Sequence, residues 1–239
     1  MIDWLRREPA DPVIDVAGRA LPIAIRRHPR ARRLTLRLAP DGSEARVTMP
    51  RWCATREAVS FARSRTDWLA AQLAKVPEEA QFEPRGTVPY RGETLEIDWQ
   101  ANRPRKPALA GDTLQAGGPA DGLHNRVTRW LEGEALRLFA QDLAFYAPRA
   151  GLPVPELRLS RAQKRWGSCS GKACIRLNWR LVMAPDEVRR SVVAHEVAHL
   201  LHFDHSPAFH AALGELFEGD LKSADIWLRR EGRSLYRFG

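Results

Sequence analysis

The chain has 239 residues, with 38 Lys and Arg against 29 Asp and Glu, which gives a net charge of +9 and a sequence pI near 10.2. This length suits one large domain or two modest ones. The N-terminal segment has no apolar core of signal-peptide length, and no apolar run approaches the roughly 18 residues of a membrane span, so we expect neither secretion nor membrane insertion.

The first half of the chain is predicted to be rich in strands. Alternating apolar residues predict strands near residues 22–27, 33–39, 44–49, 87–91 and 93–99. A single helix is expected to begin at Thr55 and to end before Pro77. Residues 101–119 hold several Gly and Pro and predict a loop with room for one short strand.

The second half is predicted to be mainly helical. Strands are expected near 155–161 and 175–181, and helices over 121–147, from 185 to about 203, 206–217 and 220–231. Ser206 as N-cap and Pro207 at the first helical position mark one of these helix starts. The chain is therefore expected to be an α+β protein. A β-rich portion with one helix would cover residues 1–119 and a catalytic domain residues 120–239, unless the two form one continuous unit.

Three cysteines, Cys53, Cys169 and Cys174, are an odd count without the spacing of a disulfide framework or a zinc finger. Reduced thiols are the simplest interpretation. We therefore expect a cytoplasmic protein.

A basic patch lies between residues 26 and 37 and contains no acidic residue. It consists of Arg26, Arg27, Arg30, Arg32, Arg33 and Arg37. In the predicted strand, leucines alternate with Arg33, Thr35 and Arg37, so these two arginines are expected on the solvent side. The patch is either the solvated face of a hairpin or a surface that binds the phosphates of a nucleotide or nucleic acid.

The most informative stretch is H-E-V-A-H at residues 195–199. On a helix, His195 and His199 share one face and can bind one metal ion. Glu196 is offset by one position and can reach a water on that metal. The flanking residues are almost all apolar, so the helix should be buried. Because a buried Glu and two buried His are costly unless something satisfies them, a metal is favoured over histidines that only pack.

Catalytic zinc usually has three protein ligands and one open position, so a third ligand is required. His205 lies ten residues after His195, at the turn predicted before Ser206, from which it can fold back onto the metal. His202 lies close to the face of the two motif histidines, and Glu215 is a more distant candidate. The sequence favours His205, and Zn²⁺ is the expected cofactor.

Two segments carry a family resemblance: Q-K-R-W-G-S-C-S-G-K-A-C-I-R-L-N-W-R-L-V-M-A-P at residues 163–185, and H-E-V-A-H-L-L-H-F-D-H-S-P-A-F. Together with R-R-H-P-R-A-R-R-L-T-L-R near the N-terminus, they resemble the YgjP-like metallopeptidase family, which is similar to the SprT-like and Wss1-like proteases of the zincin clan. The resemblance covers roughly residues 23–232. It implies a zincin-like core whose H-E-x-x-H helix packs beside a small sheet, with His195, His199 and His205 as zinc ligands and Glu196 as general base. His210 departs from the aromatic residue expected there and adds one more candidate ligand.

The segment R-W-G-S-C-S is expected to form a wall of the active-site cleft. Gly167 would allow a close approach of the backbone. Lys164 and Arg165 are either stabilisers of an oxyanion or phosphate, or surface charges near a turn. Cys169 is not expected to be a nucleophile, because the zinc site supplies an activated water.

Three functions are compatible with these features. The first is a zinc metallopeptidase acting on peptides or proteins, the second a zinc hydrolase of nucleoside triphosphates or other phosphorylated substrates. The third, a nucleic-acid-associated protein with an incidental metal site, is disfavoured because such a scaffold needs no general base. The expected partners are a peptide or protein substrate and a nucleotide or nucleic acid on the basic surface, with no membrane.

Overall fold

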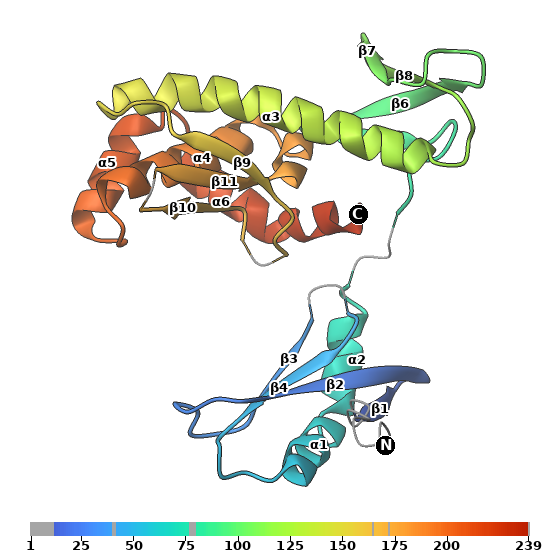
Figure 1. The fold of residues 1–239 in the computed structure, drawn as a ribbon, viewed down its shortest axis with the longest axis vertical. Coiled ribbons are helices and arrows are strands. Elements are labelled where there is room, and N and C mark those ends of the chain that lie inside the picture. The colour runs from blue at the N-terminus through green and yellow to red at the C-terminus, as the bar shows by residue number, and fades with distance from the viewer. Residues whose placement is uncertain (1–11, 40–41, 77–79, 164, 172, 239) are drawn as a thin grey trace, which may run out of the picture. The chain divides into compact units, whose positions relative to one another are not determined.

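The computed structural model describes residues 12–39, 42–76, 80–163, 165–171 and 173–238 (Figure 1). The chain forms two compact units, Met1–Pro77 and Glu78–Gly239. The sequence predicts a boundary at residues 119–120, whereas residues 80–119 belong to the second unit in the structure. Within the described ranges, no helix is long and apolar enough to cross a membrane.

The first unit contains a four-stranded sheet. Its order is β1 (Val13–Val16), β2 (Arg19–Arg27), β4 (Ala45–Met49) and β3 (Thr35–Leu38), with β2 and β4 parallel and the outer pairs antiparallel. Alternation along β2 and β4 buries Leu21, Ile23 and Val47 completely on one face. The three strands predicted in this region are confirmed, and β1 was not predicted.

Two helices, α1 (Thr55–Arg63) and α2 (Thr66–Leu73), cover the apolar face of this sheet with Ala58, Ala62 and Leu69. The sequence predicts one helix here, and the structure has two. The Ser64 hydroxyl donates to the Phe61 carbonyl at 2.9 Å, a local bond that competes with continuation of the helix. Arg65 then leaves the helical region with φ −122° and ψ 21°.

The second unit begins with another four-stranded sheet in the segment that includes the predicted loop. Its order is β5 (Thr87–Tyr90), β6 (Glu93–Gln100), β8 (Thr113–Gly117) and β7 (Ala108–Ala110), again with a parallel central pair. The prediction of β5 and β6 is confirmed. The Gly and Pro residues of 101–119 form the turns around β7 and β8 rather than one long loop.

A three-stranded sheet and a group of helices make up the rest of this unit. The sheet has the order β10 (Gly167–Ser170), β11 (Cys174–Asn178) and β9 (Glu156–Ser160), so β10 is an edge strand. The helices are α3 (Leu123–Arg149), η1 (Trp179–Met183), α4 (Asp186–Leu201), α5 (Pro207–Leu216), α6 (Leu221–Arg230) and η2 (Gly232–Arg237). The α+β class and the small sheet beside the H-E-x-x-H helix are confirmed.

A buried ion pair joins α3 to α4. Arg189 donates from Nε to Asp142 Oδ2 at 2.7 Å and from Nη2 to Oδ1 at 3.2 Å, and the two side chains are only 4% and 8% exposed. Such a two-point contact between a guanidinium and a carboxylate fixes orientation as well as distance. The helix that carries the histidines therefore has a fixed position against α3.

The turn between β5 and β6 contacts the start of α4. The Arg91 and Gly92 N–H groups donate to the Val182 and Met183 carbonyls at 2.8 and 3.1 Å, and the Arg91 side chain pairs with Asp186. Gly92 has φ +87°, and a Cβ there would lie 3.0 Å from Pro185. Only glycine fits this contact without strain.

Candidate metal centre

The local geometry around α4 returns His205 to the two motif histidines. The helix ends at Leu201, and His202 follows with extended backbone at φ −137° and ψ 112°. The next helix, α5, begins at Pro207 with the Ser206 hydroxyl accepting from the Phe209 N–H at 3.4 Å, as the sequence predicts. The short connection between these helices places His205 beside α4.

Three imidazole nitrogens, one each from His195, His199 and His205, lie within 4.8 Å of one another. The Nε2 atom of His195 is 3.1 Å from Nε2 of His199 and 3.4 Å from Nε2 of His205. Tetrahedral zinc with Zn–N bonds of 2.0–2.1 Å requires nitrogen–nitrogen separations of about 3.3 Å. The group therefore has the donor type and spacing that suit a metal ion.

A contact behind the His199 ring sets the tautomer that suits a metal. His199 Nδ1 lies 3.0 Å from the His202 carbonyl, which only accepts, so Nδ1 is the donor and Nε2 is the nitrogen that faces the histidine group. Burial, together with His199, His205 and His210, lowers the pKa of His195 to about 4. The fully buried Phe209 ring packs beneath all three imidazoles, with ring centroids 4.5 to 5.0 Å away.

The other candidate ligands lie outside this group. Within the described part of the chain, the group contains neither the His202 side chain nor His210 or Glu215. His202 contributes its backbone carbonyl instead. The His210 ring is 6.4 Å from that of His205, and Glu215 is exposed on α5.

Glu196 lies between α4 and β10 and is 5% exposed. Burial raises the pKa of its carboxyl to about 7, against an opposing effect of Arg165. A Cβ at Gly167 would lie 2.3 Å from Glu196 Oε1, so the glycine backbone is packed directly against the carboxylate. This contact gives the glycine of the R-W-G-S-C-S segment a specific steric role.

The histidines and Glu196 open onto a cleft of about 350 Å³. The rest of its lining is Arg165, Gly167, Ser168, Cys169 and Phe203. Burial, with the nearby Glu196 and Cys174, raises the pKa of Cys169, so the thiol is protonated near neutral pH. Lys164 lies outside the described residues.

Two aromatic residues of the site were not predicted. The Phe209 ring packs against the three imidazoles. The sequence indicates only that Phe209 lies in the helix that begins after Ser206. Phe203 lines the cleft with 64% of its surface exposed, an unusual position for a large apolar side chain. Nothing in the sequence distinguishes Phe203 from a buried core residue.

Replacing Gly167 with alanine is expected to displace Glu196, because overpacking of this kind costs about 1–3 kcal/mol and is relieved by movement of the crowded side chain. The kcat should fall, because a general base must lie within hydrogen-bond reach of the proton that it accepts. Peptide hydrolysis and metal content should be measured together, and the metal should stay bound. Gly171→Ala is the matched control, because a Cβ at Gly171 meets no atom within 4 Å. Equal activity in the two variants would show that this contact does not position Glu196.

The arginines of the basic patch differ in their surroundings. Arg33 and Arg37 are exposed, and cross-strand pairing aligns Arg37 with Arg46 on one sheet face. The Arg27 guanidinium donates to the Arg51 carbonyl at 3.0 Å and to Thr55 Oγ1 at 3.1 Å. Arg27 therefore has a structural role at the start of α1.

The second unit is an α+β fold. It combines a histidine triad on and after a buried helix, a buried glutamate in the same motif and a small sheet beside that helix. The profile described as YgjP-like, metallopeptidase domain, matches residues 32–231. The chain belongs to this YgjP-like family. Comparisons with curated proteins and with solved structures return no match.

Proposed function

We propose that the protein is a zinc-dependent peptidase in which His195, His199 and His205 hold the metal and Glu196 is the general base. The observation that carries this proposal is the convergence of three imidazole nitrogens within 4.8 Å beside a buried carboxyl group. Zinc bound by such a set lowers the pKa of a water ligand to about 7 and polarises a carbonyl oxygen.

Glu196 has the properties of a proton carrier. With a pKa of about 7, its carboxyl can accept a proton from the attacking water near neutral pH and return it to the leaving amine. A metal cation nearby shifts the same group toward its ionised form. Contact with Gly167 keeps the carboxylate at the wall of the cleft.

The cleft wall also offers a place for an extended peptide. Because β10 is an edge strand, a substrate can add to it as a further strand, with main-chain hydrogen bonds that do not depend on sequence. Arg165 lines the cleft and can stabilise the oxyanion. We assign Lys164 the same role only because it is next to Arg165 in the sequence. Phe203 at the rim suits an apolar side chain of the substrate.

The test is to offer zinc-loaded protein an unfolded protein substrate and nucleoside triphosphates in parallel, with and without a chelator. We expect new peptide termini by mass spectrometry, lost on chelation and restored by zinc. Release of phosphate without peptide cleavage would refute the peptidase and favour the phosphoanhydride hydrolase.

His205→Ala is expected to weaken zinc binding by more than about 100-fold. Loss of a residue that only hydrogen-bonds to a metal ligand costs up to about 100-fold in affinity, and loss of a ligand itself should cost more. His202→Ala should change affinity little, because it keeps the backbone carbonyl that accepts from His199. Competition with a chromogenic chelator measures both constants. Loss of affinity in the His202 variant alone would reverse the assignment.

We also propose that the exposed sheet face of the first unit binds phosphate groups of a nucleic acid through Arg33 and Arg37. The specific support is the charge distribution. Residues 1–77 hold 15 basic and 8 acidic side chains, a net +7, whereas residues 78–239 hold 23 and 21, a net +2. Most of the excess charge therefore belongs to the smaller unit.

The double variant Arg33→Ser/Arg37→Ser should reduce the salt dependence of duplex DNA binding. Each neutralised phosphate contributes about −0.9 to the log–log slope, so two lost contacts reduce it by up to about two units. Fluorescence anisotropy over a series of salt concentrations gives the slope. An unchanged slope, or no binding at low salt, would contradict the proposal and show that these arginines only form a solvated face.

A further inference from the structure

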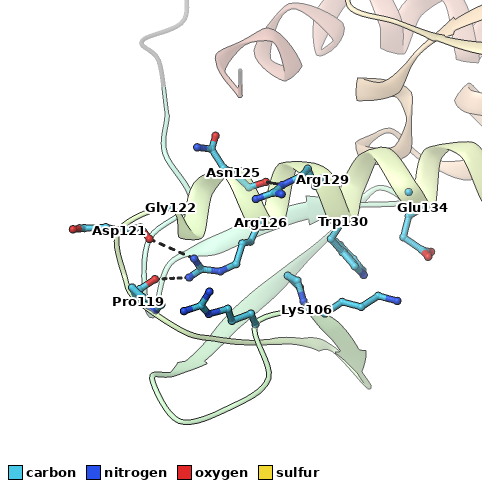
Figure 2. Close-up of a pocket in the computed structure, with 12 residues that line it drawn as sticks. Lys106, Pro119, Asp121, Gly122, Asn125, Arg126, Arg129, Trp130 and Glu134 are labelled. Carbon is cyan, nitrogen blue, oxygen red and sulfur yellow. Dashed lines mark hydrogen bonds between the residues drawn. The ribbon is translucent and has the colours of Figure 1, made fainter.

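A second cavity of the catalytic unit lies away from the histidines, beside the N-terminal turns of α3 (Figure 2). Its volume is about 870 Å³. The wall is formed by the loop between β6 and β7, by the connection from β8 to α3 and by α3 itself. The lining side chains include Arg105, Lys106, Asp121, Arg126, Arg129, Trp130 and Glu134.

The loop that carries Arg105 and Lys106 is held in place. A Cβ at Gly117 would lie 2.1 Å from the Arg103 carbonyl oxygen, so the loop packs against the end of β8. Arg103 Nη1 donates to the Asp98 carbonyl at 3.0 Å, and Trp99 Nε1 donates to the Gly118 carbonyl at 3.0 Å. The cationic side chains of the cavity therefore extend from a fixed backbone. A ligand would lose little binding free energy to ordering this loop.

The cavity has an excess of positive charge. Among the residues that the structure describes, Arg105, Lys106, Arg126 and Arg129 take part in no ion pair. Glu134 is already occupied, because it accepts from Tyr90 Oη at 2.7 Å and pairs with Arg137 at 2.6 Å.

Arg126 and the start of α3 add to this field. Arg126 donates to the neutral Pro119 and Asp121 carbonyls, so its charge is not compensated there, and its Nε is buried without a partner in the described structure. The first turn of α3 contains no acidic residue and no side-chain N-cap. Helix N-termini favour anions, and the first turn of α3 itself supplies no acidic side chain to that end of the helix.

An aromatic ring lies among these cations. Trp130 extends from α3 toward the side of the cavity that carries Lys106 (Figure 2). Its ring packs on Tyr90 at 5.1 Å between centroids, which fixes its orientation. Cations that follow a phosphate chain, combined with an aromatic ring on which a base stacks, are typical of surfaces that bind single-stranded nucleic acid.

We propose that this cavity binds a single-stranded nucleic acid, with Arg105, Lys106 and Arg129 at the phosphates and Trp130 against a base. The site is distinct from the histidine cleft and does not depend on the peptidase proposal. It is also distinct from the arginine face of the first unit.

The experiment measures anisotropy of a fluorescent oligothymidine with the full chain, across a series of salt concentrations. Arg105→Ser/Lys106→Ser should reduce the log–log salt slope by up to about 1.4, at about 0.7 per phosphate of a single strand. The charge-matched control is Lys222→Ser/Arg233→Ser, two exposed positions outside the cavity. Trp130→Leu should weaken binding about tenfold or more with the slope kept, since stacking is not ionic.

Thermal unfolding shows whether Trp130→Leu is folded, and the double variant decides the question if it is not. Equal slopes for the Arg105/Lys106 variant and its control would overturn the proposal. So would inorganic triphosphate competing as strongly as the oligonucleotide, because the cavity would then bind phosphate alone.

Discussion

The Glu196→Gln variant is expected to retain its metal and to lose hydrolysis, with kcat lower by about 10²- to 10⁴-fold, the usual contribution of a general acid–base. Glutamine has nearly the same shape, so the contact with Gly167 and the position of α4 are preserved. The amide cannot accept the proton of the attacking water. The three proposed histidine ligands are untouched, so zinc stoichiometry by elemental analysis should equal that of the parent.

Glu215→Gln is the matched control for this variant, because Glu215 is exposed and lies outside the histidine group. Steady-state kinetics of both variants on one peptide substrate would separate a general effect of charge from a role of the buried carboxyl. Activity of Glu196→Gln within a few-fold of the parent would remove Glu196 from the mechanism. Loss of zinc in the same variant would make it a ligand or a structural residue instead.

Arg189→Met is expected to destabilise the protein by about 3–5 kcal/mol, the cost of leaving one partner of a buried ion pair without the other. Asp142 would remain 8% exposed, with Arg190 only at 3.9 Å. Chemical denaturation followed by circular dichroism gives the free energy of unfolding. Because the pair joins α3 to the histidine helix, zinc affinity should fall as well.

Two comparisons make the second prediction specific. Arg229→Met removes an exposed pair with Asp225 and should change the unfolding free energy little. The double variant Arg189→Met/Asp142→Leu, with both charges removed, should recover part of the stability lost in the single variant. A single variant as stable as the parent would show that the ion pair does not hold the two helices together.

The candidate metal-binding segment could be predicted from sequence because its signals are local. The i, i+4 histidines, the apolar flanks and the Ser206-Pro207 helix start each act within one or two turns. The structure brings His195, His199 and His205 together as those signals indicate. It also places the glycine of R-W-G-S-C-S against Glu196.

Other features depend on tertiary contacts that no local pattern encodes. The strand β7 is an exposed Ala-Leu-Ala segment, whose extended form depends on pairing with β8. Phe203 resembles any other apolar residue in sequence, although it is exposed at the cleft. The excess of positive charge in residues 1–77 likewise depends on a boundary between units that no local pattern marks.

The contact of the β5–β6 turn with Pro185 has a consequence for truncated forms of the protein. Arg91 and Gly92 bond to the chain immediately before α4, and Arg91 also pairs with Asp186 in its first turn. A recombinant fragment that begins at residue 120 would lose these bonds. It would also expose apolar surface at the N-terminal end of α4. Shortened forms of the protein for crystallisation or screening should therefore retain the sheet formed by residues 87–117.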